Sequence, residues 1–207
     1  MENLNENDSQ LINFINKNKI KVDGIIQVGA NTGQEIELIK QITKNILCFE
    51  PIPEAFNVLQ SNNQDILSYN FALGDVEEIK NIFTATNNYE SSSFLKPKNH
   101  STYYPSIKFS VRENISIKRF DNLDIDIKNK YNVLISDTQG YEIKVLKGFG
   151  EMLKYIDLIY VEYINSELYE GDSSLTHISD YLSSFNFKLE ETTTETNGAG
   201  NALFKKI

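Results

Sequence analysis

Residues 25–33 read IIQVGANTG, in which the apolar run 25–28 ends at Gly29 and a helical pattern follows. Glycines in such a loop let the backbone pass close to a ligand, and the start of the following helix offers free N–H groups. Glu50 closes the next apolar run, 46–49, about 20 residues after Gly29, where a carboxylate can accept hydrogen bonds from both hydroxyls of a ribose. Together these features predict a nucleoside-binding site at the carboxyl ends of two neighbouring strands. The alternative for Glu50 is a salt bridge at a strand end.

The glycine pattern also indicates which nucleoside to expect. Gly29 and Gly33 alone are a weak signal, because glycines after strands often only form tight turns. The loop lacks the three glycines expected for a dinucleotide pyrophosphate, and it lacks the GK[ST] of a phosphate-binding loop. A nucleoside without phosphates fits this loop better, and S-adenosylmethionine is the commonest cofactor of that kind.

Strands and helices alternate along most of the chain, which predicts an α/β fold with a mostly parallel sheet and right-handed crossovers. The predicted strands are residues 25–28, 46–49, 66–71, 133–136 and 158–161, and the predicted helices are residues 9–18, 33–42, 53–62, 141–153 and 178–185. Residues 187–193 and 202–204 flank a turn at Asn197-Gly198-Ala199-Gly200. These two runs predict an antiparallel hairpin at the sheet edge.

The chain of 207 residues is the size of one α/β domain, and it has no internal repeat and no long linker. We therefore expect a single domain over residues 1–207, with residues 1–20 as an N-terminal helical extension. Residues 79–120 are less regular, apart from a strand-like run at residues 115–117. We expect this irregular segment to cover the active site.

Composition argues against several partners. A net charge of −9 disfavours broad contact with nucleic acid phosphates. No apolar run reaches the roughly 18–20 residues that span a bilayer, and the acidic start lacks the features of a signal peptide. The single cysteine, Cys48, cannot form an internal disulfide and is expected to be a buried structural thiol. These features predict a cytoplasmic protein without a membrane partner, and they leave its oligomeric state open.

Short sequence blocks in a fixed order cover nearly the whole chain, from about Val22 to Phe204. The blocks are Val28-Gly29-Ala30-Asn31-Thr32-Gly33, Phe49-Glu50-Pro51-Ile52-Pro53, Ala72-Leu73-Gly74-Asp75, Ser91-Ser92-Ser93, Arg119-Phe120-Asp121-Asn122-Leu123, Asp137-Thr138-Gln139-Gly140-Tyr141-Glu142, Val145-Leu146-Lys147-Gly148 and Val161-Glu162. In this order they resemble the FkbM family of S-adenosylmethionine-dependent methyltransferases. The resemblance implies a Rossmann-like class I methyltransferase sheet of seven strands, the last antiparallel, with helices on both faces. It also implies a hydroxyl acceptor.

One position departs from the family pattern. The family usually has an acidic residue two positions before the first glycine, where this chain has Gln27. The amide keeps a carbonyl acceptor but loses the charge that helps to hold the cofactor's ammonium. We expect weaker cofactor binding, and a non-catalytic descendant of the family is an alternative.

The predicted cofactor site follows the first four strand ends. It consists of Gln27, Gly29, Ala30, Asn31, Thr32, Glu50, Pro51, Ala72, Leu73, Asp75 and Asp137. The first loop should line the methionine and ribose side and Glu50 should hold the ribose, whereas the resemblance places adenine near Ala72, Leu73 and Asp75. Asp75 has an alternative as a turn or helix-cap residue.

The predicted catalytic residues are Asp137, Glu162 and His100. Asp137 ends the run 133–136, and a carboxyl partly buried against the sheet can act as the base that removes the acceptor proton. Alternatively Asp137 only grips the cofactor's ammonium. Glu162 with Asp137 could bind a sugar diol, share a proton or hold a divalent metal. The sequence shows no dense carboxylate cluster that requires a metal, so we predict no metal ligand.

Hydroxyls and aromatic rings gather in the covering segment and after residue 162. The predicted acceptor-binding residues are Ser92, Ser93, Tyr103, Tyr104, Glu162 and Tyr169. Such side chains suit a sugar or another polyol, although a solvated surface loop would carry them equally well. The sequence therefore predicts an O-methyltransferase acting on a sugar hydroxyl of a glycan or glycosylated metabolite. A binding module without catalysis and a nicotinamide-dependent enzyme are the alternatives.

Overall fold

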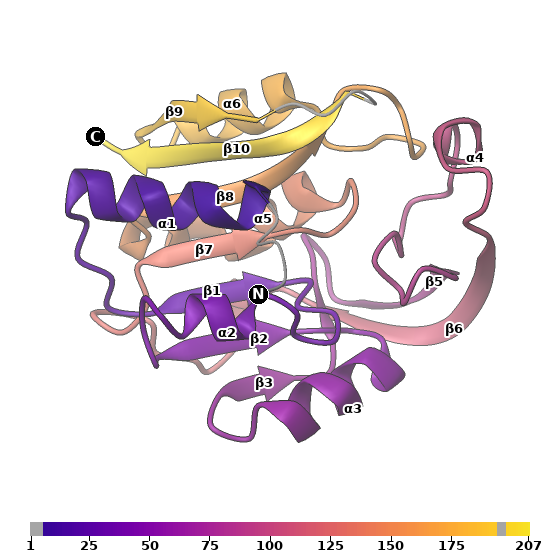
Figure 1. Ribbon diagram of the computed structural model, residues 1–207, viewed down its shortest axis with the longest axis horizontal. Helices are drawn as coiled ribbons and strands as arrows, with labels where there is room; N and C mark the ends of the chain where they lie inside the picture. The colour runs from indigo at the N-terminus through magenta and orange to yellow at the C-terminus, as the bar shows by residue number, and fades with distance from the viewer. Residues whose placement is uncertain (1–5, 194–197) are drawn as a thin grey trace.

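A computed structural model describes residues 6–193 and 198–207. Its main sheet has seven strands in the order β3-β2-β1-β7-β8-β10-β9 (Figure 1). The strands are β1 Ile25–Val28, β2 Ile46–Phe49, β3 Leu67–Tyr69, β7 Val133–Ser136, β8 Leu158–Ile164, β9 Phe187–Thr192 and β10 Ala199–Lys206. β3, β2, β1, β7 and β8 are parallel, and β10 runs antiparallel to both β8 and β9. The predicted α/β fold with an antiparallel C-terminal pair is confirmed.

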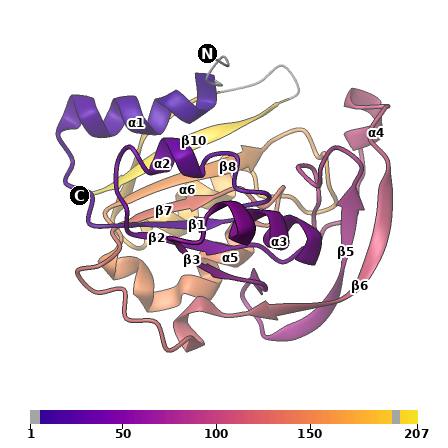
Figure 2. The same cartoon turned by 60° about the horizontal axis from the view of Figure 1, so that its bottom comes forward.

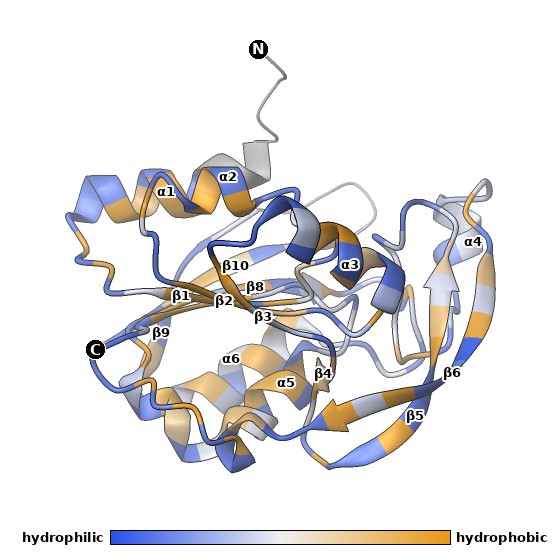
Figure 3. Cartoon of the chain, turned by 90° about the horizontal axis from the view of Figure 1, so that it is seen from below, coloured by the Kyte–Doolittle hydropathy of each residue, from blue (hydrophilic) through white to orange (hydrophobic). Residues whose placement is uncertain are grey.

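Helices cover both faces of this sheet (Figure 3). The helices are α1 Glu6–Asn18, α2 Ile36–Ile39, α3 Pro53–Asn62, α5 Glu142–Phe149 and α6 Leu175–Ser183. α1, α2 and α3 pack on one face, where one apolar cluster includes Leu11, Ile36 and Leu59. α5 and α6 pack on the other. β1, β2 and β7 are buried along their whole length, which explains why their sequences are mostly apolar rather than alternating.

A second, smaller sheet stands beside the carboxyl ends of the main strands (Figure 2). Its order is β4-β6-β5, with β4 Ala72–Leu73, β5 Glu78–Ala85 and β6 Phe109–Lys118. The prediction of an irregular segment over residues 79–120 is therefore wrong at both ends, where β5 and β6 pair antiparallel. Between them, residues 86–108 form turns, loops and the short helix α4, His100–Tyr103. β5 was missed, and β6 was indicated only by the strand-like run at residues 115–117, because both strands are only partly buried and neither carries a clean apolar pattern.

Several predicted helices have different bounds. The predicted helix over residues 33–42 contracts to the single turn of α2, and the one over residues 141–153 divides into α5 and a 3₁₀ helix at Gly150–Tyr155. The division falls at Gly150, whose φ of 49° cannot continue a right-handed α-helix. α1 packs Leu11, Phe14 and Ile15 into the same cluster as β1, so this N-terminal helix contributes to the core. The predicted turn at 197–200 includes Asn197, which lies outside the described residues.

Within the described ranges, each helix is too short or too polar to cross a bilayer.

Candidate active site

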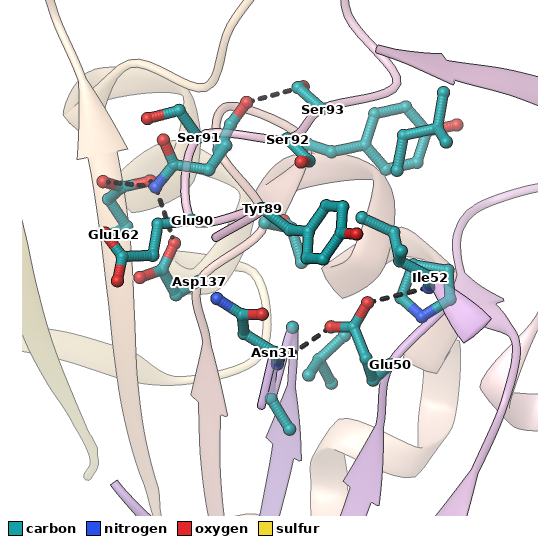
Figure 4. A pocket seen from close by; sticks show the side chains of 18 of the residues that line it. Asn31, Glu50, Ile52, Tyr89, Glu90, Ser91, Ser92, Ser93, Asp137 and Glu162 are labelled. Carbon is teal, nitrogen blue, oxygen red and sulfur yellow. Dashed lines mark hydrogen bonds between the residues drawn. The ribbon is translucent and has the colours of Figure 1, made fainter. Parts of the chain in front are cut away.

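A cavity of about 490 Å³ opens at the carboxyl ends of β1, β2, β7 and β8 (Figure 4). Its floor comes from the strand ends and the loops that leave them, and its cover comes from the segment between β5 and β6. The size falls within the range of small-molecule and cofactor pockets. In a parallel α/β sheet, this edge is where ligands bind.

The loop after β1 approaches its neighbours closely. Gly29 and Ala30 donate their N–H groups to the backbone oxygen of Phe49, and a Cβ on Gly29 would collide with the backbone oxygen of Asp137. Gly29 also has a φ of 82°, which disfavours any other residue. The glycine is therefore required by packing between strand ends, and it leaves the cavity-facing side of the loop open.

Glu50 is the carboxylate at the end of β2. Its Oε2 accepts the backbone N–H of Asn31 at 2.9 Å, and its Oε1 accepts that of Ile52 at 2.8 Å (Figure 4). Because the side chain is only 4% exposed, burial raises its pKa to about 7. Each oxygen can accept further hydrogen bonds, so Glu50 can receive two hydroxyls from a ligand in the cavity.

Gln27 lies on β1 beneath the loop, and its side chain is almost fully buried. Its Nε2 donates to Oε2 of Glu35 at 2.6 Å, and the thiol of Cys48 donates to its Oε1 across 3.9 Å. The carbonyl oxygen expected to face the cofactor is thus turned toward a thiol. The charged group on this side of the cavity is Glu35, at the start of α2.

Three carboxylates converge beside β7 and β8, where Glu142 begins α5 and Glu162 lies within β8. Asp137, which follows β7, is exposed and not partly buried as the sequence predicts. One oxygen from each of Asp137, Glu142 and Glu162 lies within 4.8 Å of the others. Oxygen ligands in such a group suit Mg²⁺ or Ca²⁺. The amide of Gln139, however, spans two of them, with Nε2 at 2.9 Å from Oδ1 of Asp137 and at 3.0 and 3.1 Å from the oxygens of Glu162 (Figure 4). Burial, and then the charge of Asp137, raise the pKa of Glu162 well above its usual range.

Glu142 holds the loop that carries Asp137 in place through hydrogen bonds. Its Oε1 accepts the backbone N–H and the hydroxyl of Thr138, at 2.9 and 3.0 Å, and the backbone N–H of Gly140 at 3.1 Å. The side chain is fully buried, and burial raises the pKa of Glu142 above its usual range. Glu142 therefore has a structural task at the edge of the site.

We expect Glu142→Ala to lower the free energy of unfolding by about 2–4 kcal/mol, because one buried and two partly buried donors lose their acceptor. An acid with a raised pKa in the folded state contributes less stability as pH rises above its unfolded value near 4.5. The difference between wild type and Glu142→Ala should therefore shrink between about pH 5 and pH 8. Urea unfolding at both pH values measures it.

Glu142→Gln is the matched control, because it keeps an acceptor at Oε1 without an ionisable group. Its loss should be smaller than that of Glu142→Ala. A loss for Glu142→Ala below about 0.5 kcal/mol would remove the anchoring role.

The covering segment, residues 86–108 between β5 and β6, lies over the cavity. Tyr89 from this segment lies in the middle of the site (Figure 4). The serines there are partly engaged in holding the segment itself. Oγ of Ser92 accepts the N–H of Ala85, and Oγ of Ser93 donates to the backbone oxygen of Gln139 at 2.7 Å. Ser92 and Ser93 line the cavity but also anchor its cover, so a ligand would compete with these internal bonds.

His100 lines the cavity on the covering side with only 1% exposure. Its ring packs against Tyr104, Phe109 and Tyr169. Burial lowers the pKa of His100, which favours the neutral ring, and its Nδ1 has no hydrogen-bond partner among the described residues. A neutral imidazole with an unpaired nitrogen can bind a ligand hydroxyl.

The cavity brings together most of the residues that the sequence predicts for the site. It is lined by Gln27, Gly29, Ala30, Asn31, Glu50, Pro51, Ala72, Leu73, Ser92, Ser93, His100, Tyr104, Asp137 and Glu162. They come from five strand ends and the cover, as the α/β pattern requires.

The structure places four predicted residues of the described chain outside the cavity lining. Thr32 follows Asn31, whose positive φ turns the loop. Thr32 does not line the cavity, whereas Asn31 and Gln34 on either side of it do. Asp75 pairs with Nζ of Lys144 at 2.9 Å and joins the smaller sheet to α5.

The other two are tyrosines. Tyr103 points out of α4 and is 47% exposed. Tyr169 is fully buried, and its hydroxyl donates to the backbone oxygen of Ser91 at 2.8 Å and to Oε1 of Gln139 at 3.2 Å. Tyr169 therefore orients Gln139 instead of contacting a ligand.

Sequence reasoning missed Glu35, Gln139 and Glu142. Glu142 belongs to the block at residues 137–142 but was assigned no role there. Its spacing of four residues from Thr138 was the available signal. Gln139 belongs to the same block, but neither Gln139 nor Glu35 had a spacing that indicated its role, because both roles depend on how two loops face each other.

Comparison with known proteins agrees with this geometry. The family model described as the methyltransferase FkbM domain matches residues 27–189. A curated relative, 2-O-methyltransferase NoeI of Sinorhizobium fredii, is 28% identical over 180 residues, which covers 78% of this chain and 71% of the relative.

Solved structures share the fold. The FkbM methyltransferase of Methylobacillus flagellatus superimposes with a TM-score of 0.57 at 14% identity over 88% of this chain, and this chain spans only 43% of that longer one. An S-adenosylmethionine-dependent methyltransferase of Clostridium acetobutylicum gives a TM-score of 0.57 at 10% identity, covering 99% of this chain and 93% of its own. The magnesium protoporphyrin IX methyltransferase of Synechocystis, solved with bound S-adenosylmethionine, gives 0.55 at 9% identity, covering 98% and 79%. At such identities the likeness concerns the fold alone.

Proposed function

This chain belongs to the FkbM methyltransferase domain family, and on that basis we propose that it is an S-adenosylmethionine-dependent O-methyltransferase whose acceptor is a sugar hydroxyl. The acceptor would belong to a glycan or a glycosylated metabolite. The proposal goes beyond family membership in three respects, which are the cofactor, the acceptor atom and the acceptor class.

The charge of the cavity favours S-adenosylmethionine as the cofactor. Its lining, within the described ranges, has five acidic side chains and neither lysine nor arginine; the acids are Glu35, Glu50, Glu90, Asp137 and Glu162. S-adenosylmethionine bears a sulfonium and an ammonium, so an acidic cavity attracts it. A nicotinamide dinucleotide bears a pyrophosphate, which the ionised carboxylates would repel and for which this lining offers no lysine or arginine. This observation favours the sulfonium cofactor over the dinucleotide alternative.

The adenosyl group has a suitable place at the ends of β2 and β4. Glu50 can accept the ribose hydroxyls, because each of its carboxylate oxygens can take a further hydrogen bond. Apolar side chains beside it, from Phe49, Ile52 and Leu73, form the wall on which an adenine ring can pack. Asn31 presents its backbone N–H to Glu50, which couples the loop after β1 to the ribose position.

Bound cofactor would supply an electrophilic methyl group for an in-line displacement. The residues of this chain then have to align the acceptor, exclude water and remove the acceptor proton. Asp137, which follows β7, and Glu162, on β8, line the cavity beneath the covering segment, where we expect the acceptor to bind. We assign proton removal to Asp137, whose Oδ1 accepts the amide of Gln139 at 2.9 Å, whereas the raised pKa of Glu162 favours the protonated form of that neighbour.

The relative NoeI is named as a 2-O-methyltransferase, which supports an oxygen acceptor. The acceptor side of the cavity supports a polyol. Tyr89 and Tyr104 offer aromatic faces, His100 offers an unpaired nitrogen, and the carboxylates can accept hydrogen bonds from a diol.

The test is incubation with methyl-labelled S-adenosylmethionine and a panel of sugars, glycolipids and glycosylated metabolites, followed by mass spectrometry. The expected product is a methyl ether on a sugar hydroxyl, with S-adenosylhomocysteine released in equal amount. Amine acceptors of matched size serve as controls. Tight cofactor binding without product across the panel would favour a binding module instead. Thermal stabilisation by NAD and not by S-adenosylhomocysteine would overturn the cofactor assignment.

A further inference from the structure

Three polar side chains form a chain beneath the loop that follows β1. Cys48 on β2 and Gln27 on β1 are register partners in the sheet, and Glu35 stands just before α2. The Cys48 thiol donates to Oε1 of Gln27 across 3.9 Å, and Nε2 of Gln27 donates to Oε2 of Glu35 at 2.6 Å. The first two are buried, whereas Glu35 is half-buried and lines the cavity.

The direction of this chain is fixed by its buried end. Burial, and then the charge of Glu35, raise the pKa of the Cys48 thiol to about 12, so the sulfur keeps its proton and donates. Gln27 must then present its carbonyl to Cys48 and its amide to Glu35. The Glu35 side chain does not cap α2. Its carboxylate is held at the cavity wall by Gln27.

The three substituents of a sulfonium point in three directions, and the cavity offers an acidic wall for each. The adenosyl group belongs with Glu50 at the end of β2. The methyl group belongs with Asp137 and Glu162, because the covering segment and the acceptor lie there. Of the remaining acids, Glu90 is exposed and belongs to the cover. Glu35 is the one on the floor, below the loop after β1.

We propose that Glu35 binds the α-ammonium of the cofactor's amino-acid arm and that Gln27, itself oriented by Cys48, is a positioning residue for that carboxylate. This assignment rests on the proposed function, because it requires S-adenosylmethionine in the cavity. It gives a role to a buried glutamine and a buried cysteine that the methyl-transfer chemistry does not use.

The test compares two ligands that differ in the amino-acid arm. S-adenosylhomocysteine carries the arm, and 5′-methylthioadenosine keeps the adenosyl group but lacks the arm. We expect Glu35→Gln to weaken S-adenosylhomocysteine by about 10- to 100-fold, the effect of losing one charged hydrogen bond, and to change 5′-methylthioadenosine by less than about twofold. Isothermal titration calorimetry at pH 8 measures both affinities.

Glu37→Gln is the matched control, because Glu37 is a strongly exposed acid on α2 that pairs with Lys40 at 3.2 Å. It should change neither affinity. Gln27→Leu should weaken S-adenosylhomocysteine by a smaller factor than Glu35→Gln and should also spare 5′-methylthioadenosine.

The outcomes distinguish a failure of the proposed function from a failure of the Glu35 assignment. If wild type binds neither ligand, the proposed function fails. If wild type binds both and Glu35→Gln weakens both equally, Glu35 acts on the fold of the site and the assignment to the ammonium is wrong. Unchanged binding of S-adenosylhomocysteine by Glu35→Gln overturns the assignment as well. Because 5′-methylthioadenosine reports an intact adenosyl site, a misfolded variant is recognised directly.

Discussion

Asp137→Asn should lower kcat by about 100- to 10,000-fold, the range expected when a positioned general base is removed. The substitution keeps the size and shape of the side chain but removes its capacity to take a proton. Asp137 Oδ1 accepts the Gln139 amide at 2.9 Å, and that same amide holds Glu162. The asparagine can retain this contact through its own oxygen, so the geometry of the cluster should survive.

Separate measurements of chemistry and binding distinguish a base from a residue that only positions the cofactor. Single-turnover methyl transfer should slow by the full factor, whereas the affinity for S-adenosylhomocysteine should change by less than about threefold. A variant whose affinity falls while its single-turnover rate at saturation stays normal would assign Asp137 to the cofactor instead.

Asp75→Asn is the matched control for this prediction. Asp75 follows another strand, pairs with Lys144 at 2.9 Å and stands outside the cavity lining. Losing that partly exposed ion pair should leave kcat unchanged. If Asp137→Asn turns over near the wild-type rate, proton removal belongs to another group, and His100 becomes the residue to test.

The central strands of the fold were predictable because strands buried on both faces of a parallel sheet consist mostly of apolar residues. β1, β2 and β7 are mostly apolar, and the structure buries every residue in them. Their carboxyl ends were predictable as well, because charged residues, Glu50 and Asp137, directly follow the apolar runs of β2 and β7. A strand end is a local feature of the chain.

The smaller sheet was not predictable in this way. β5 and β6 pair across a separation of more than 20 residues, and much of their surface is exposed. Such strands are specified by pairing and register rather than by an apolar face, so the sequence pattern resembles a loop.

Roles that depend on side-chain direction across two loops also lay beyond the sequence. Glu142 reaches back to the loop at Thr138, and Gln27 turns its carbonyl away from the cavity toward Cys48. Tyr169 suited a sugar by residue type, but its hydroxyl is committed to Ser91 and Gln139. Residue type indicated the chemistry available at this edge of the sheet, and packing determined which groups face a ligand.

Glu50→Ala should weaken S-adenosylhomocysteine by at least about tenfold, with a larger loss expected if both ribose hydroxyls donate to the carboxylate, since each charged hydrogen bond contributes about 1.5–3 kcal/mol. The substitution also removes the acceptor for the backbone N–H groups of Asn31 and Ile52. The loop after β1 therefore loses a fixed position at the same time. Calorimetric titration measures the affinity, and unchanged binding would take Glu50 out of the ribose site.

The pH dependence of binding gives the sharper test of Glu50. Ribose hydroxyls donate best to the ionised carboxylate, and in the free protein burial raises its pKa to about 7. Affinity should therefore rise as pH increases toward 7 and level off above it, with binding at pH 6 about tenfold weaker than the plateau. Glu50→Gln cannot ionise, so its affinity should be weak and independent of pH across this window. If the wild-type affinity is flat between pH 6 and pH 8 while Glu50→Ala still binds poorly, the residue acts through the loop at Asn31 and Ile52 and not through the ribose.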